Sequence, residues 1–126
     1  MDEAVRKLAA DSGELRRIAG RRSGAGYVVL DLVFDHGRLR LTADADTDEI
    51  IVRVDASGAS DAAQIADDAV LAPLLGKRIE LAWTMVNDRG YADAFQIRCL
   101  DLESRDESCC QFEVGAAAIR VARVTV

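Results

Sequence analysis

The chain lacks several features that would place it in a large class of proteins. No apolar run approaches the eighteen residues that a membrane-spanning helix needs. Residues 1–17 mix charged and apolar side chains and hold no apolar stretch typical of a secretory signal. The three cysteines follow no metal or disulfide spacing, which is typical of free thiols in a reducing compartment. We therefore expect a cytoplasmic protein without membrane contact.

The sequence is equally short of catalytic motifs. Its single histidine, His36, is predicted to lie at a hairpin tip, where no pocket is expected to support a general base. The glycine-rich residues 22–26 have neither the Lys-Ser/Thr pair of a phosphate-binding loop nor the pattern of a following helix. A G-x-S-x-G nucleophile element is missing as well. We expect no cofactor and a function other than catalysis.

Length and charge limit the remaining classes. The chain has 126 residues, half of them hydrophobic, which suits one domain with its own core. Residues 1–40 carry eight basic and six acidic side chains, whereas residues 41–126 carry eight basic and sixteen acidic ones, a net charge of −8. Phosphate backbones repel such an acidic body, so nucleic-acid binding is not expected.

Alternating apolar and polar side chains predict three successive strands, at residues 28–34, 39–43 and 50–55. Their apolar side chains share one face, as in an antiparallel meander with one side toward water. Acids and bases that can pair across strands are expected on the wet side: Asp31, Asp35, Arg38, Arg40 and Arg53.

The rest of the chain extends this pattern. A short helix is expected over residues 2–10 and a second one over residues 61–75, ended by Pro73 and Gly76. Further strands are predicted at residues 14–19, 79–85, 91–103, 108–114 and 117–126. The fold class is thus α+β and predominantly antiparallel β, a single domain over residues 1–126. Seven or eight strands would form a meander-like sheet or an open barrel, with one or two short helices.

The predicted C-terminal strand, residues 117–126, is a candidate sheet edge. Arg120 and Arg123 would then guard it against pairing with another chain. If that edge is open, a homodimer could form by strand addition.

An acidic segment, residues 44–49, places carboxylates at alternate positions, with Asp44, Asp46 and Asp48 in the first, third and fifth places of an EF-type calcium loop. The sixth place should be glycine but is Glu49, and a strand follows where a helix should. A polar hairpin loop is therefore the preferred interpretation, and Asp44, Asp46 and Asp48 are the candidate ligands if a cation does bind.

The cysteines Cys99, Cys109 and Cys110 could converge if the strands at 91–103 and 108–114 pair. Four zinc ligands are not available nearby, and adjacent cysteines close a disulfide poorly. Small core side chains are therefore expected. Because neighbouring residues of a strand point to opposite faces, one of Cys109 and Cys110 is expected to be exposed.

The second half of the chain holds a hairpin around a four-residue turn, residues 87–90, in which Asn87 can bond to its own backbone. Trp83 and Tyr91 flank this turn and could stack across the strands. Asp93 is an acid on a face that should be apolar. It either fixes the turn by a buried hydrogen bond or belongs to a ligand pocket formed with Trp83, Asn87 and Tyr91.

Residues 74–97 read L-x-G-K-x-I-x-x-A-W-x-x-x-N-x-x-G-Y-x-D-A-F-Q-I, and the acidic turn precedes them. Together these segments resemble a family of small bacterial domains of unknown function. The resemblance implies a bacterial cytosolic protein. It supplies no activity, cofactor or catalytic residue.

Two functional hypotheses remain. The first is a non-catalytic protein-binding module, for example an immunity-type antitoxin, that masks a basic partner with Asp44, Asp46, Asp48 and Glu49. The alternative is a small-ligand or enzymatic site in the pocket around Asp93.

Overall fold

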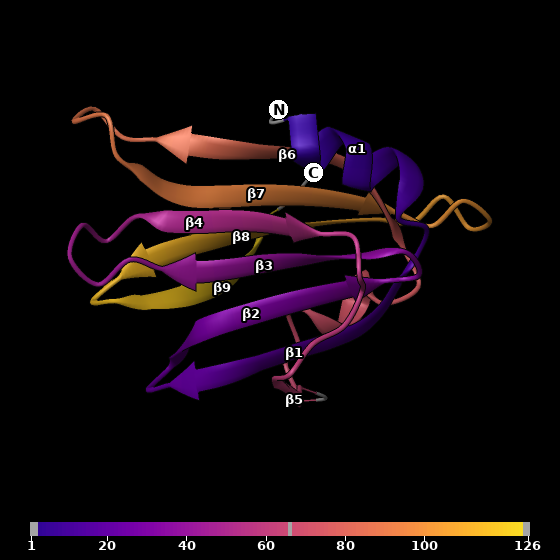
Figure 1. Ribbon diagram of the computed structural model, residues 1–126. Helices are drawn as coiled ribbons and strands as arrows, with labels where there is room; N and C mark the ends of the chain where they lie inside the picture. Colours follow the sequence, from indigo (N-terminus) through magenta and orange to yellow (C-terminus); the bar gives the residue numbers. More distant parts are fainter. Residues whose placement is uncertain (1–2, 66, 125–126) are drawn as a thin grey trace.

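The computed structural model describes residues 3–65 and 67–124. Over these residues the chain forms one α-helix, nine strands and one short 3-10 helix (Figure 1). In chain order they are α1 Glu3–Asp11, β1 Leu15–Ser23, β2 Gly26–Phe34, β3 Gly37–Ala43, β4 Ile50–Asp55, β5 Ala63–Gln64, η1 Ala72–Leu74, β6 Arg78–Val86, β7 Ala92–Leu100, β8 Glu107–Gly115 and β9 Ala118–Val124. All strand pairs are antiparallel, so the predicted fold class is confirmed.

The strands form two meanders joined at one point. The sheet order is β4-β3-β2-β9-β8-β7-β6, and β1 pairs with both β2 and the short β5. Strands β1–β4 form the first meander and β6–β9 the second. Their junction is the pairing of Tyr27 on β2 with Ile119 on β9. The sheet curls into a half-barrel, in which the first meander lies across from β8 and β9 (Figure 1).

The interior of this half-barrel is the hydrophobic core. Leu30 and Leu32 of β2 are completely buried in it, and so is Ile97 of β7. Two phenylalanines, Phe95 and Phe112, meet there with ring centroids 6.4 Å apart. The amphipathic α1 contributes buried apolar side chains to the same cluster. Among the described residues, no helix has the length and apolar character required to cross a bilayer.

The free edges differ from the prediction. The C-terminal strand is not the end of the sheet, because β9 pairs with β8 along its length and also with β2, but the pairing with β2 is at Ile119 alone. Residues 125 and 126 of the predicted strand lie outside the described residues. The path of the sheet ends instead at β4 and β6. Arg120 and Arg123 lie on the part of β9 that pairs with β8 alone, so their role in guarding this strand stays a prediction.

The helix predicted over residues 61–75 is wrong. Residues 59–61 cross the outer face of the first meander, the face turned away from the core, whereas Leu71 and Leu74 are buried in the core. Ala63 and Gln64 pair with β1, and Ile65 N donates to Ile18 O at 2.9 Å. In the described part of residues 61–75, helical structure is limited to η1, and the Asp68 carboxylate accepts hydrogen bonds from the backbone amides of Val70 and Leu71. Pairing with β1 and this local capping compete with the helical preference of the alanines.

The crossing segment also buries a residue expected to face water. Asp31 on β2 is completely buried. Its carboxylate accepts two hydrogen bonds from Arg40, at 2.7 and 2.8 Å, and one from Ser60 Oγ at 2.5 Å. Burial alone raises the pKa of Asp31, but the hydrogen bonds from Arg40 and Ser60 and the charges of Arg40 and Arg38 outweigh it, so the pKa lies below its usual range. A buried ionic network thus pins the segment to the sheet.

Candidate functional site

The acidic loop between β3 and β4, residues 44–49, is a tight turn held by its own backbone. Asp48 N donates to Asp44 O at 2.9 Å, and Asp44 N donates to Glu49 O at 2.8 Å. The Asp44 carboxylate accepts from Asp46 N at 2.9 Å, which is an Asx turn. Asp48 adopts a left-handed backbone conformation, with φ of 54°. The loop is therefore the polar hairpin loop that the sequence favours.

Two of its carboxylates reach into the second meander. Asp48 Oδ1 accepts a hydrogen bond from Ala117 N, in the turn between β8 and β9, at 3.1 Å. Glu49 Oε2 accepts one from Ala92 N, at the start of β7, at 3.1 Å. Over residues 3–65 and 67–124, no group of three or more His, Cys, Asp or Glu side chains is placed to hold a metal ion. The loop joins the two meanders at the end of the half-barrel where their hairpin turns meet.

The β6–β7 hairpin carries the four residues of the predicted ligand pocket. Asn87 Oδ1 accepts from the backbone amides of Arg89 and Tyr91, and its Nδ2 donates to Asp93 Oδ2 at 3.4 Å. This is the hydrogen bond that would fix the turn. Trp83 pairs with Gln96 across the strands, and Tyr91 lies outside β7, so the expected stacking of their rings is not formed.

Five clefts on the described surface are lined by other residues. A ligand pocket formed by Trp83, Asn87, Tyr91 and Asp93 therefore stays a prediction, and the contact found for Asp93 is the one within the turn.

Large apolar side chains are exposed on the same hairpin. The exposed fraction is 45% for Leu81, 36% for Met85, 62% for Val86 and 45% for Tyr91. A register shift in β6 follows Ile79, which pairs with the buried Cys99. After the shift, residues 81, 83 and 85 of β6 face outward. They pair with Arg98, Gln96 and Ala94 of β7, respectively. The shift thus turns a row of apolar side chains toward the outer face. Among the described strands, β6 pairs with β7 only, so it is an edge strand of the sheet.

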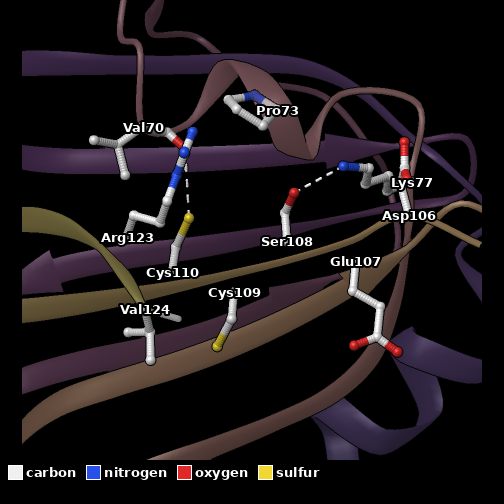
Figure 2. A pocket seen from close by; sticks show the side chains of 10 residues that line it. All are labelled: Val70, Pro73, Lys77, Asp106, Glu107, Ser108, Cys109, Cys110, Arg123 and Val124. Carbon is white, nitrogen blue, oxygen red and sulfur yellow. Dashed lines mark hydrogen bonds between the residues drawn. The ribbon is translucent and has the colours of Figure 1, made fainter. Parts of the chain in front are cut away.

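A separate cleft of about 560 Å³ lies where β8 and β9 meet the segment around η1 (Figure 2). Lys77 Nζ donates to Ser108 Oγ at 2.7 Å on one side of it. Arg123 opposes Cys110 across the strands, and Cys110 Sγ lies 3.5 Å from Val70 O. The cleft therefore places two basic side chains beside a hydroxyl and a thiol.

The three cysteines are all buried, and they are free. Burial raises the pKa of Cys99 to about 12 and that of Cys110 to about 11, and it also raises the pKa of Cys109. The expectation that one of Cys109 and Cys110 is exposed is wrong. Cys109 does point to the outer face, but it lies between Arg98 and Val124 in the sheet, which leave it 3% exposed. These protonated thiols are poor nucleophiles and poor metal ligands.

Comparison with known families identifies one relationship that covers the chain. A model of a family of unknown function, DUF6334, matches residues 1–126. The chain belongs to this family. No curated protein and no solved structure matched the chain. Membership of DUF6334 assigns no activity to any residue.

Sequence reasoning missed the cleft of this DUF6334 chain altogether. Lys77 and Ser108 are thirty-one residues apart, and Arg123 comes from a third element. Their meeting depends on the register of β8 with β9 and on the course of the segment before β6. One feature of the sequence does indicate part of the cleft. Ser108 and Cys110 are two residues apart in a predicted strand, so their side chains lie on the same face.

Proposed function

We propose that this member of DUF6334 is a non-catalytic protein-binding module. Its interface is the β6–β7 hairpin together with the acidic loop. The observation that carries the proposal is the row of exposed apolar side chains at Leu81, Met85, Val86 and Tyr91. A cluster of large apolar side chains on one exposed hairpin is typical of a surface that another protein covers.

The edge of β6 supports the same interpretation. Exposed edge strands are usually protected by proline or by charged side chains. In β6 the charged residues Arg78 and Glu80 stand at the start, and the six residues that follow are uncharged and include no proline. The backbone along residues 81–86 is thus suited to pair with an extended segment of another protein.

The charge around this edge indicates the chemistry of the partner. The acidic loop and the turn at residues 87–93 together contain six carboxylates and one guanidinium, a net charge of −5. Glu49 links the two segments directly by accepting from Ala92 N. The partner is therefore an extended apolar segment flanked by basic side chains, as a basic toxin domain could supply to an immunity-type protein. Complementary charge would speed its association.

The proposal is tested by photocrosslinking in cells of the source organism. A photoreactive phenylalanine analogue replaces Thr84, which is exposed on β6, and in a matched control it replaces Arg105 in the loop between β7 and β8. We expect one crosslinked protein from position 84 and none from position 105. The double variant Asp44→Asn with Asp46→Asn should slow its association at low salt but not at high salt.

Three results would contradict the proposal. Crosslinking of the same proteins from both positions would mean that contact is non-specific. An absence of products from position 84 would remove the hairpin as an interface. A crosslink to a second copy of this chain, with a dimer in analytical ultracentrifugation, would make β6 a homodimer interface and remove the separate basic partner.

A further inference from the structure

The cleft between η1 and strands β8 and β9 has no role in the proposed protein interface. We infer that it is a binding site for a small organic carboxylate with an apolar body. The inference depends on the donors that line the cleft, on its balance of charge and on its walls, and it is independent of the proposed partner.

Hydrogen-bond donors line the cleft on two sides, with Lys77 and Ser108 on one side and Arg123 on the other (Figure 2). Lys77 Nζ donates to Ser108 Oγ at 2.7 Å, which leaves the hydroxyl hydrogen of Ser108 free to donate to a ligand. Lys77 has two further N–H groups. Arg123 lines the same cleft and makes no ion pair within residues 3–65 and 67–124. An ammonium, a guanidinium and a hydroxyl group suit an oxyanion, and the guanidinium can hold both oxygens of a carboxylate.

Two acidic residues at the rim of the cleft favour an oxyanion with a single negative charge. Asp106 and Glu107 also line the cleft, and neither forms an ion pair with Lys77 or Arg123. The Glu107 side chain points away from the Lys77–Ser108 contact (Figure 2). The two acids balance the formal charge of the two bases. A dianionic phosphate would be repelled by this rim more strongly than a monoanion. A carboxylate is therefore favoured over a phosphate.

The walls accept the rest of the molecule. Val70, Pro73 and Cys110 present apolar surface beside the donors. The pKa of Cys110 is raised, so that side chain is a neutral thiol at pH 7. The cleft volume of about 560 Å³ is within the range of small-molecule sites. An aliphatic or aromatic body can cover these walls while the carboxylate binds Arg123, and the positive charge of Lys77 lies on the other side of the same cleft.

The test is an amide-resolved NMR titration of the full chain at pH 7 with hexanoate and with benzoate. The neutral controls are hexan-1-ol and benzyl alcohol, and inorganic phosphate is the dianionic control. We expect saturable shifts at the amides of Ser108, Cys110 and Val70 with the two carboxylates only. Arg123→Gln should weaken the affinity about tenfold, because it removes a charge-assisted contact. Arg120→Gln is the matched control, since Arg120 is exposed on β9 outside this cleft.

The outcomes separate cleanly. Shifts at the cleft that are lost in Arg123→Gln and retained in Arg120→Gln support the site. Equal shifts with the neutral alcohols, or equal loss in both arginine variants, would overturn it. Phosphate binding as tight as that of benzoate would overturn the choice of a carboxylate. No shift with either carboxylate at millimolar concentration would remove the site, whatever the crosslinking at β6 shows.

Discussion

The two meanders of this DUF6334 chain differ in how their outer faces are covered. The outer face of β1–β4 is covered by the segment before η1, and its central acid, Asp31, is completely buried under that segment. The outer face of β6–β9 has no covering segment of this kind among the described residues. At its edge Leu81 and Val86 are 45% and 62% exposed.

This difference separates stability from recognition. In the first meander polar groups are hydrogen-bonded inside the protein, so their removal should cost stability. In the second meander apolar groups face outward, where they contribute little to the core. The second meander also supplies β8 and β9 to the carboxylate cleft. We therefore place the apolar row of the proposed interface and the strands of the cleft on the second meander, to which the first meander adds the acidic loop.

The largest expected effect follows from breaking the buried network of the first meander. Asp31→Asn should lower the free energy of unfolding by about 3 kcal/mol, because Arg40 then loses a buried charged partner. Chemical denaturation at pH 7 measures the loss. The folded pKa of Asp31 is depressed, so its stabilisation is present above the ordinary aspartate pKa of about 4 and is lost as the pH falls. The variant should therefore lose less stability on acidification than the wild type.

The matched control is Asp67→Asn. Asp67 also pairs with an arginine, Arg22, but both side chains are largely exposed. An exposed ion pair is screened by water, so the change in unfolding free energy should be below about 1 kcal/mol. Equal losses in the two variants would mean that burial of Asp31 adds nothing to its pairing with Arg40.

The second prediction breaks the junction of the meanders. A Cβ at Gly26 would lie 2.5 Å from Ile119 O, a backbone atom that cannot move without shifting β9. Gly26→Ala should therefore cost about 2 kcal/mol in thermal or chemical unfolding. Gly115→Ala, on β8 beside the same end, meets no atom within 4 Å and should be nearly neutral. A neutral Gly26→Ala variant would show that the two meanders do not depend on this contact.

The strands could be predicted because their side chains alternate, and the shared apolar face of β2 and β3 follows from Leu30, Leu32, Leu39 and Leu41, all buried. The segment at 61–75 could not be predicted in the same way. Its alanines favour a helix locally, whereas its actual conformation depends on pairing with β1, which is more than forty residues away.

The candidate sites show the same limit. The acidic loop was predicted as a hairpin loop, but local sequence does not reveal that Glu49 accepts from Ala92 N. One of Cys109 and Cys110 is expected to be exposed, because strand alternation places their side chains on opposite faces. Alternation assigns a face but not what covers that face, and here Arg98 and Val124 lie beside the Cys109 thiol.

The third prediction concerns this link between the meanders. Glu49→Ala should lower the free energy of unfolding by about 1 kcal/mol, because the partly buried amide of Ala92 loses its acceptor. Glu49→Gln keeps an acceptor oxygen at the same distance and should recover most of the loss. If glutamine fails to restore stability while salt weakens the wild type, then charge rather than the hydrogen bond joins the loop to β7.

The smallest expected effect is the most informative about function. The double variant Leu81→Thr with Val86→Thr replaces apolar side chains that are already about half exposed, and threonine is well tolerated in strands. The free energy of unfolding should therefore change by less than about 0.5 kcal/mol. The same variant should abolish the crosslink from position 84, since the proposed partner would lose its apolar contact. A loss of stability as large as that of Gly26→Ala would instead mean that the exposed apolar side chains of β6 stabilise the second meander. Unchanged stability with lost crosslinking would assign the exposed row to recognition.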